Sequence, residues 1–183
     1  GSREFLDSRN LNYRNVDDLG PIYGHQWRHF NADYYTSDAD YTNKGVDQLM
    51  YIINALKDPK EKYSRRLIMS AWNPCQLDEM ALPPCHVLSQ FIVKNNELTT
   101  ILYQRSGDIG LGIPFIIASY SFLTHILAKH CDIEAKELVH IIGDAHIYEE
   151  HAYALKEQID RTPFKFPLIK IASTIQEKID DYE

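Results

Sequence analysis

The chain has 183 residues, of which 44% are hydrophobic and 25% are charged, and this is the composition of one ordinary globular domain. It excludes a disordered chain, a collagen-like repeat and a small disulfide-dense scaffold. The 19 Lys and Arg residues against 26 Asp and Glu residues give a formal net charge of −7, so no overall basic field exists to attract nucleic acid or anionic lipid.

The first clear element along the chain is a helix over Val46–Lys57. Its apolar residues recur at helical spacing, which predicts an amphipathic surface helix. Asp58-Pro59 closes the pattern, because proline lacks the backbone N–H that a further helical turn needs.

Short apolar runs in the middle of the chain predict strands. Leu67–Trp72 is such a run, and it follows the charged pair Arg65-Arg66. Val87–Val93 and Leu98–Tyr103 are strand-like and are separated only by Asn95-Asn96-Glu97, which predicts a β-hairpin.

The second half of the chain predicts two helices and two strands. Ile113–His130 is apolar almost all round, which is typical of a helix buried in the middle of a domain. Leu138–Ile142 predicts a strand that ends in a turn at Gly143-Asp144, Ile147–Ile159 predicts a helix, and Leu168–Ala172 is expected to form a final strand. Because strands and helices alternate but a hairpin is present, we expect a mixed sheet in an α/β or α+β domain.

The cysteines and the apolar stretches indicate a cellular location. Cys75, Cys85 and Cys131 are an odd number without a Cys-x-x-Cys pair, which favours free thiols in a reducing compartment. The start of the chain has no leader pattern, and Ile113–Ala128 is interrupted by polar residues and shorter than a membrane span. We therefore expect a soluble cytoplasmic protein, with a nuclear location as the alternative.

Cys85 is the strongest candidate for a nucleophile. It follows Pro83-Pro84, which stiffen the backbone, and it opens a predicted strand. Most free cysteines are packed like small hydrophobic residues, so a structural role is the alternative. A thiolate needs a nearby cation, and Arg65, Arg66 and Arg105 are the candidates.

Gln104–Asp108 leaves a predicted strand and runs into Gly110-Leu111-Gly112, which suggests an anion-binding loop. The glycines match neither dinucleotide nor P-loop fingerprints, so a plain turn is the alternative. His146 and His151 are separated by four residues rather than three, which is not the spacing of a zinc helix. We therefore expect hydrogen-bonding roles for them and no metal.

Several motifs occur together in one order, and the chain resembles thymidylate synthase across nearly its whole length. The motifs are Asp18–Gly24, Gln26-Trp27-Arg28, Arg65-Arg66, Ala71–Pro74, Ala81–His86, Tyr103–Asp108 and Gly143–Tyr148.

The resemblance implies one thymidylate synthase domain over residues 1–183, incomplete at both ends, with a mixed sheet and helices packed around a buried central helix. It implies that dUMP is methylated to dTMP, with 5,10-methylenetetrahydrofolate as the donor of both the one-carbon unit and the hydride, and without a metal. Cys85 would add to C6 of the uracil ring, so that C5 becomes an enolate-like carbon able to attack the methylene group.

The same resemblance implies roles for further residues. Arg105 and Ser106 would bind the 5′-phosphate, and Arg65 and Arg66 would reach it from the partner subunit of a homodimer. Tyr23 would transfer a proton at C5, with a buried tyrosine of satisfied hydroxyl as the alternative. The implied catalytic residues are Cys85, Tyr23, His86, Arg105 and Asp108; further nucleotide contacts are Gln104, Ile116, His146 and Tyr148; the implied folate contacts are Asn73, Asp108, Gly112 and Phe115.

One residue departs from the family pattern. The motif Pro-Phe-Asn-Ile-Ala-Ser-Tyr occurs here as Pro114–Tyr120, with Ile116 in place of the asparagine. That amide pairs with the N3 and O4 edge of uracil, and each unpaired polar group costs on the order of 1–3 kcal/mol. The change predicts weaker selection of dUMP, and because dCMP hydroxymethylases have an aspartate here, it does not favour cytosine either.

Relatives also carry a long segment before Gly1, with a catalytic glutamate and an arginine phosphate loop, and a C-terminal segment that closes over the folate. The sequence contains neither segment. We therefore expect the central part of a longer protein, in which a fused or associated dihydrofolate reductase is one arrangement.

Two other functions stay open alongside the enzyme. Ile116 favours a catalytically impaired homologue that binds nucleotide or folate, and an enzyme similar to dCMP hydroxymethylase is a further alternative. A regulatory RNA-binding role is a third interpretation, and the net charge of −7 does not favour it.

Overall fold

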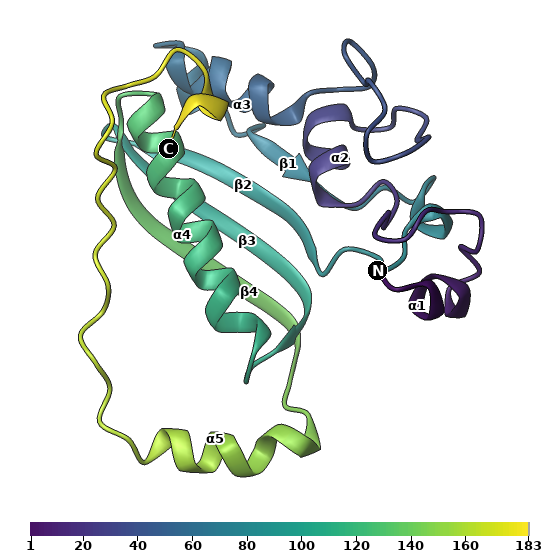
Figure 1. Ribbon diagram of the computed structural model, residues 1–183. Helices are drawn as coiled ribbons and strands as arrows, with labels where there is room; N and C mark the ends of the chain where they lie inside the picture. The colour runs from purple at the N-terminus through teal and green to yellow at the C-terminus, as the bar shows by residue number, and fades with distance from the viewer. Residues whose placement is uncertain (183) are drawn as a thin grey trace.

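The computed structural model describes residues 1–182 and contains a four-stranded mixed sheet in the order β1-β2-β3-β4 (Figure 1). The strands are β1 (Ile68–Ser70), β2 (His86–Lys94), β3 (Glu97–Asp108) and β4 (Glu134–His146). The first three are antiparallel neighbours, whereas β4 is parallel to β3. The expected mixed α/β class is confirmed.

The predicted hairpin is confirmed by the pairing of β2 with β3. Lys94 lies opposite Glu97, and the two residues between them, Asn95 and Asn96, have φ of 53° and 62°. Positive φ at both central positions is the geometry of the tight turn that matches the twist of the strands. Asparagine adopts this region more readily than most residues because its short polar side chain can hydrogen-bond locally.

β3 and β4 are both longer than the sequence predicts. β3 continues through Asp108 because β4 pairs with it to the end, with Ser106 opposite Asp144 and Asp108 opposite His146. The predicted loop over Gln104–Asp108 and the predicted turn at Gly143-Asp144 are therefore wrong. The parallel ladder satisfies backbone groups that a local pattern leaves unassigned.

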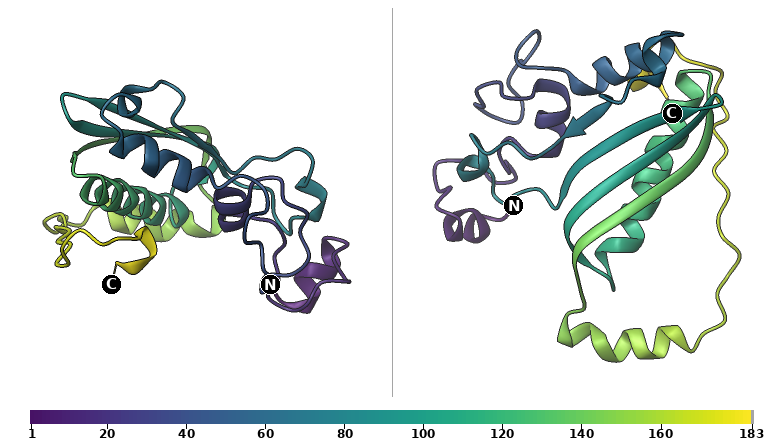
Figure 2. Two further views of the ribbon diagram at one scale, coloured as in Figure 1. Left: turned by 90° about the horizontal axis from the view of Figure 1, so that it is seen from above. Right: turned by 180° about the vertical axis from the view of Figure 1, so that it is seen from behind.

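Two helices, α3 (Gln48–Lys57) and α4 (Gly112–His130), cover the same face of the sheet, as Figure 2 shows from above. The predicted helix over Val46–Lys57 is confirmed, but it begins two residues later because Val46 pairs with Phe30 and Asp47 accepts the N–H of Met50 at 2.9 Å as the N-cap. The buried core between these layers contains Leu49, Ile52, Ile53, Leu56, Leu67, Met69, Phe91, Val93, Leu98, Leu127 and Cys131.

α4 is confirmed as a helix, but the expectation that it is buried on all sides is wrong for the described residues. Tyr120, Thr124 and Leu127 are buried on the inner side, whereas Phe115 is 67% exposed and Phe122 is 49% exposed. By length and composition alone α4 is apolar enough to cross a membrane, and core helices of soluble proteins also satisfy this criterion. In this structure it packs against β3 and β4.

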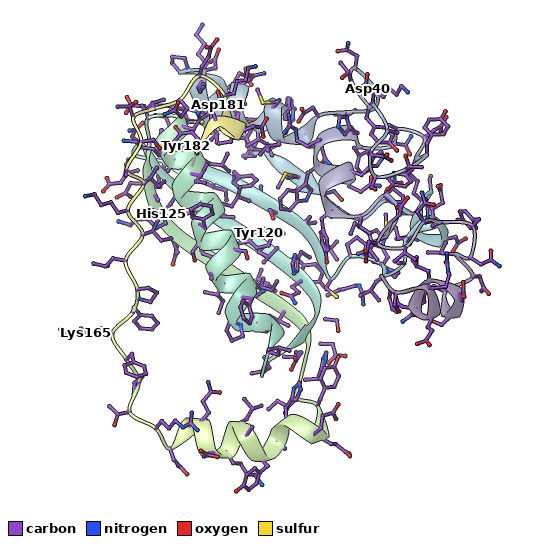
Figure 3. The ribbon with its side chains drawn as sticks, viewed as in Figure 1. Asp40, Tyr120, His125, Lys165, Asp181 and Tyr182 are labelled. Atoms are coloured by element: carbon purple, nitrogen blue, oxygen red, sulfur yellow. The ribbon has the colours of Figure 1, made fainter. Side chains whose placement is uncertain are left out.

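After α5 (Ala152–Ile159) the C-terminal part of the chain runs back past the β4 edge of the sheet toward the C-terminal end of α4 (Figure 1). The predicted helix at Ile147–Ile159 is present in two pieces, η3 (Glu149–His151) and α5. The predicted final strand at Leu168–Ala172 is wrong, because this segment is extended but unpaired in the described part of the chain. Figure 3 shows Lys165 on the extended chain between α5 and this segment, and Tyr182 beside the C-terminal end of α4, after η4 (Ile179–Asp181).

The N-terminal region forms short elements that the sequence patterns do not predict. α1 (Arg3–Ser8), α2 (Tyr23–His29), η1 (Glu61–Tyr63) and η2 (Leu77–Glu79) are each too short to show a helical period. α1 and α2 lie on the β1 side of the sheet, next to the start of β2 (Figures 1 and 2). This arrangement brings the first residue of α2 to the segment that precedes β2.

Candidate active site

Cys85 and Arg105 are held side by side by the pairing of β2 with β3. His86 lies opposite Gln104, and the backbone N–H of Arg105 donates to the carbonyl of Cys85 at 2.9 Å. Backbone pairing thus extends one residue beyond the first residue of β2. It fixes the main chain of Cys85 against that of Arg105.

The side chain of Arg105 also turns toward Cys85. Its Nε donates to the carbonyl of Pro84 and its Nη2 to the carbonyl of Pro83, each at 2.9 Å. The same Nη2 lies 3.8 Å from Sγ of Cys85, which is half-buried. A guanidinium at this position favours the charged form of a thiol, which is the nucleophilic form.

Tyr23, the first residue of α2, holds the segment from the other side. Its hydroxyl oxygen accepts the backbone N–H of Cys85 at 2.8 Å and that of His86 at 3.5 Å. Burial raises the pKa of Tyr23 above its usual value, so the phenol keeps its proton at neutral pH. Among residues 1–182 that proton has no acceptor, so it is available to a ligand.

Apart from Arg105, the polar side chains near Cys85 are neutral. Burial, with the nearby His140, lowers the pKa of His86 to about 4, and its ring lies 4.9 Å from that of Tyr23. Gln104 is buried, and its Oε1 lies 2.8 Å from Nε2 of His140, which fits the tautomer with hydrogen on Nε2. The amide nitrogen of Gln104 is also hydrogen-bonded, because it donates to the carbonyl of Ser106 at 2.8 Å.

A second group of candidate residues lies at the ends of β3 and β4. Asp108 accepts the N–H of Gly110 at 3.0 Å and lies 3.8 Å from Nδ1 of His151. His146 is opposite Asp108 in the sheet, and its ring lies 5.2 Å from that of Tyr148. Its buried Nδ1 makes no hydrogen bond in the described part of the chain but lies 3.7 Å from Oδ1 of Asp144. A buried nitrogen without a hydrogen bond is unusual and suits a ligand group.

The start of α4 adds an open apolar surface beside Asp108. A Cβ built on Gly112 would contact only Cβ of Asp108, at 3.8 Å, and otherwise project into open space. Phe115 is exposed here, and Ile116 is half-buried. The amide of Asn73, by contrast, is buried and donates to the side-chain oxygens of Gln26, Gln76 and Asn31 at 2.9 to 3.3 Å.

Arg65 and Arg66 do not approach Cys85 within one chain. Both are exposed at the turn before β1, and the pairing of Ser70 with Leu88 shows that the opposite end of β1 lies toward Cys85. Their guanidinium groups make no hydrogen bond within residues 1–182. Of the three candidate cations, only Arg105 is placed at the sulfur.

Some residues of the site have no signal in local sequence patterns. The amide of Gln26 meets that of Gln76 across 50 positions of sequence, and the amide of Asn31 meets that of Asn73 across 42. His140 interrupts an otherwise apolar strand, and this is the one signal that could have indicated a polar contact there.

The chain is similar to known proteins over nearly its whole length. Residues 3–183 match the family model for thymidylate synthase. The chain is 57% identical over 174 residues to a probable thymidylate synthase of Schizosaccharomyces pombe, which covers 91% of this chain and 28% of the relative. It is 53% identical over 192 residues to the thymidylate synthase of Saccharomyces cerevisiae, which covers 100% of this chain and 62% of the relative.

A third relative has two activities in its name. The bifunctional dihydrofolate reductase-thymidylate synthase of Paramecium tetraurelia is 57% identical over 171 residues, covering 93% of this chain and 37% of the relative. The chain therefore spans between 28% and 62% of the length of these three relatives.

The low pKa of His86 predicts a pH dependence of stability. The folded-state pKa of about 4 lies below the unfolded value of 6.5, so in this window the unfolded chain takes up a proton that the folded chain does not. We expect the free energy of unfolding to fall as the pH decreases through this window. In urea unfolding experiments, His86→Gln should reduce the dependence of the free energy of unfolding on pH by up to about 1.4 kcal/mol per pH unit. The reduction is smaller to the extent that solvent screens the imidazole.

The matched control is His125→Gln, since His125 lies on the exposed side of α4 (Figure 3). This variant should keep the slope of the unmodified chain. An unchanged slope in His86→Gln would contradict the assignment of a buried neutral imidazole at that position.

Proposed function

The chain belongs to the thymidylate synthase family, and we propose that it carries the nucleophile and the phosphate-binding residues of an enzyme that converts dUMP to dTMP. The observation that supports this most directly is the 3.8 Å contact between Nη2 of Arg105 and Sγ of Cys85. One guanidinium can stabilise a thiolate and bind a phosphate oxygen with its remaining nitrogen. Nucleotide binding and nucleophile activation would then meet at Arg105.

The proposed covalent step begins at Cys85. Sγ attacks C6 of the uracil ring, and the electron pair of the C5–C6 double bond moves to C5, where it is delocalised onto the O4 carbonyl. C5 would then attack the methylene carbon of 5,10-methylenetetrahydrofolate, whose bonds to N10 and then to N5 break. The tetrahydrofolate so formed would give a hydride to this carbon, which completes the methyl group, and would leave as dihydrofolate. Once the C5 proton is lost and the methyl group is complete, the C6–sulfur bond breaks and the thiolate is regenerated.

Tyr23 is the residue that we propose to move the proton at C5. Its raised pKa keeps the phenol protonated, and its hydroxyl oxygen is already oriented by the N–H groups of Cys85 and His86. A phenol with a fixed oxygen and a free proton can pass a proton to or from a bound ligand. His86 would serve as a neutral hydrogen-bonding partner beside it.

The nucleotide would lie along the ends of β3 and β4. Ser106 follows Arg105 and can donate its hydroxyl to the same phosphate. His146 and Tyr148 would bind the 3′-hydroxyl of the deoxyribose, and their adjacent rings, 5.2 Å apart at the end of β4, support this role. Gln104 would contact the nucleotide with the second hydrogen of its amide nitrogen, since the first is bound by Ser106 and the amide oxygen by His140.

The residues near α4 fit the folate. The open space over Gly112 and the exposed ring of Phe115 offer a flat apolar surface, and Asp108 supplies a carboxylate at its edge. Asn73 would act indirectly, since its amide is used inside the protein. No metal enters this proposal.

Ile116 supports a second candidate function, a homologue with impaired turnover or altered base selection. An isoleucine offers neither donor nor acceptor, so the N3 and O4 groups of uracil would lose a partner. The contacts of Tyr23 and Arg105 with Cys85 are present despite this change. Ile116 would therefore affect base recognition rather than the activation of the nucleophile.

We propose that the functional form is a homodimer built on the face of the sheet opposite α4. In the described residues no helix covers that face (Figure 2, right). Its apolar side chains Ile68, Ile92, Tyr103 and Ile141 are between 39% and 48% exposed. Arg65 and Arg66 lie beside this face and would reach the phosphate bound in the partner subunit.

The relatives also suggest a larger assembly. Curated relatives from Paramecium tetraurelia, Plasmodium chabaudi and Zea mays are bifunctional proteins that include dihydrofolate reductase. We propose that residues 1–183 form part of a longer thymidylate synthase domain, with a fused or associated dihydrofolate reductase as the partner. Such a partner would reduce the dihydrofolate that the reaction releases.

The assignment of Cys85 predicts a specific covalent adduct. Incubation with 5-fluoro-dUMP and 5,10-methylenetetrahydrofolate should add the mass of nucleotide plus folate, because fluorine at C5 cannot leave as a proton would. Cys85→Ser should abolish the adduct, whereas Cys75→Ser and Cys131→Ser should retain it. Burial raises the pKa of Cys131 to about 11, so this thiol stays protonated. An adduct that survives in Cys85→Ser, detected by intact mass, would refute the assignment.

Ile116 predicts a gain of base selectivity on restoring the amide. Ile116→Asn should bind dUMP about tenfold or more tightly than the unmodified chain, since each recovered hydrogen bond is worth on the order of 1–3 kcal/mol. Binding of dCMP should improve less. The measurement is calorimetric titration with both nucleotides, with Ile116→Val as the control that keeps an aliphatic side chain; equal gains for both bases would contradict the proposed contact.

The homodimer predicts complementation between two inactive variants. Cys85→Ser lacks the nucleophile, and the double variant Arg65→Gln, Arg66→Gln lacks the donated arginines. Random mixing after unfolding and refolding should restore the adduct in about a quarter of the sites, because half of the dimers are mixed and one site in each is intact. No restoration, with dimers shown by sedimentation, would place the arginines in their own subunit's site.

A further inference from the structure

Trp72 is the residue near the nucleophile to which no role has been given above. Its indole ring lies against Arg105, with Cζ of the guanidinium 5.7 Å from the ring centroid. This is within the range in which a cation over an aromatic face is attracted by the ring quadrupole. Trp72 is half-buried, so water does not fully screen the contact.

The other contacts of Arg105 fix only one edge of its planar fork. Nε and Nη2 are engaged by the carbonyls of Pro84 and Pro83, and Nη2 also meets the sulfur of Cys85. Nη1 has no hydrogen bond within residues 1–182. A plane held along one edge can still tilt about that edge, and only a contact on its face prevents the tilt.

The backbone of Trp72 is fixed on both sides, which sets where the indole begins. The backbone N–H of Trp72 donates to Oγ of Ser70 at 3.2 Å, and its backbone carbonyl accepts from the same hydroxyl at 3.2 Å. The residue before it is tied to β2, since Ala71 N–H donates to the carbonyl of Val87 at 2.9 Å. The residue after it, Asn73, is anchored in the buried amide network.

We propose that Trp72 is a positioning residue that acts through Arg105. The indole face holds the guanidinium plane so that one edge stays beside the sulfur of Cys85 and Nη1 stays free for an anion. The effect on the sulfur depends only on the contacts described here. The effect on the anion rests on the proposed function, in which that anion is the 5′-phosphate of the nucleotide.

The test is the rate of alkylation of Cys85 by iodoacetamide, measured as a function of pH in a Cys75→Ser background and read at Cys85 by peptide mass. This reaction needs neither nucleotide nor folate, so it remains informative even if the chain makes no dTMP. Trp72→Leu should slow alkylation at pH 7 by about threefold and move the rate profile to higher pH by about half a unit, because the cation is held less firmly at the thiolate.

A double-mutant cycle separates positioning from a general structural effect. In an Arg105→Gln background, Trp72→Leu should change the rate by less than about 1.5-fold, because the cation through which it acts is gone. Trp72→Phe keeps an aromatic face and should retain most of the rate and the profile of the unmodified chain. The matched control is Trp27→Leu, since the second tryptophan of the chain packs edge-on to Tyr120 rather than on Arg105.

Each outcome decides the proposal. A threefold loss that disappears without Arg105 and is rescued by phenylalanine supports it. An equal loss in both backgrounds, or the same loss in Trp27→Leu, would show that Trp72 only stabilises the fold and would overturn it, as would an unchanged profile in Trp72→Leu. The phosphate part is tested separately by comparing the binding of dUMP with that of deoxyuridine in Trp72→Leu. If the proposed nucleotide is wrong, only this part of the proposal fails, and the alkylation result still stands.

Discussion

The register between β2 and β3 is the constraint on which the rest of this structure depends. It turns Phe91 and Leu102 toward the helices, where they are fully buried. The same ladder extends to the backbone hydrogen bond between Arg105 and Cys85. Because side chains alternate along a strand, a slip of one residue would move the core residues to solvent and the arginine away from the thiol together. Folding stability and the geometry of the site are thus set by one pairing.

Burial then determines which groups around Cys85 carry charge. Desolvation raises the pKa of Tyr23 and lowers that of His86, so both side chains are neutral at physiological pH. Arg105 keeps its charge because a guanidinium is protonated at any ordinary pH. The carbonyls of Pro84 and Pro83 accept hydrogen bonds from the guanidinium and hold it beside the thiol. The sulfur therefore meets one permanent cation among neutral partners.

The two faces of the sheet have different roles. One face is buried under α3 and α4, and its side chains form the core. The opposite face is apolar but uncovered in the described residues, with Arg65 and Arg66 exposed at its margin. Since these arginines lie at the end of β1 away from Cys85, a single chain does not bring them to the nucleophile. A second copy on the uncovered face would explain both the apolar surface and the distant arginines.

The sequence by itself determined the family, the hairpin, the helix that ends at Lys57 and Cys85 as the candidate nucleophile, because each of these depends on residue types at short spacing. It failed for β3 beyond Tyr103 and for β4 on both sides of Leu138–Ile142, where the parallel ladder extends the strands through residues with turn-like patterns. It also expected α4 to be buried on all sides, since composition does not specify which neighbours a helix meets. The tertiary structure alone decided that Arg105, and not Arg65 or Arg66, lies at the sulfur, and that Trp72 lies on the guanidinium. Such contacts join residues more than ten positions apart, and only the strand register and the packing of β1 against β2 bring them within reach.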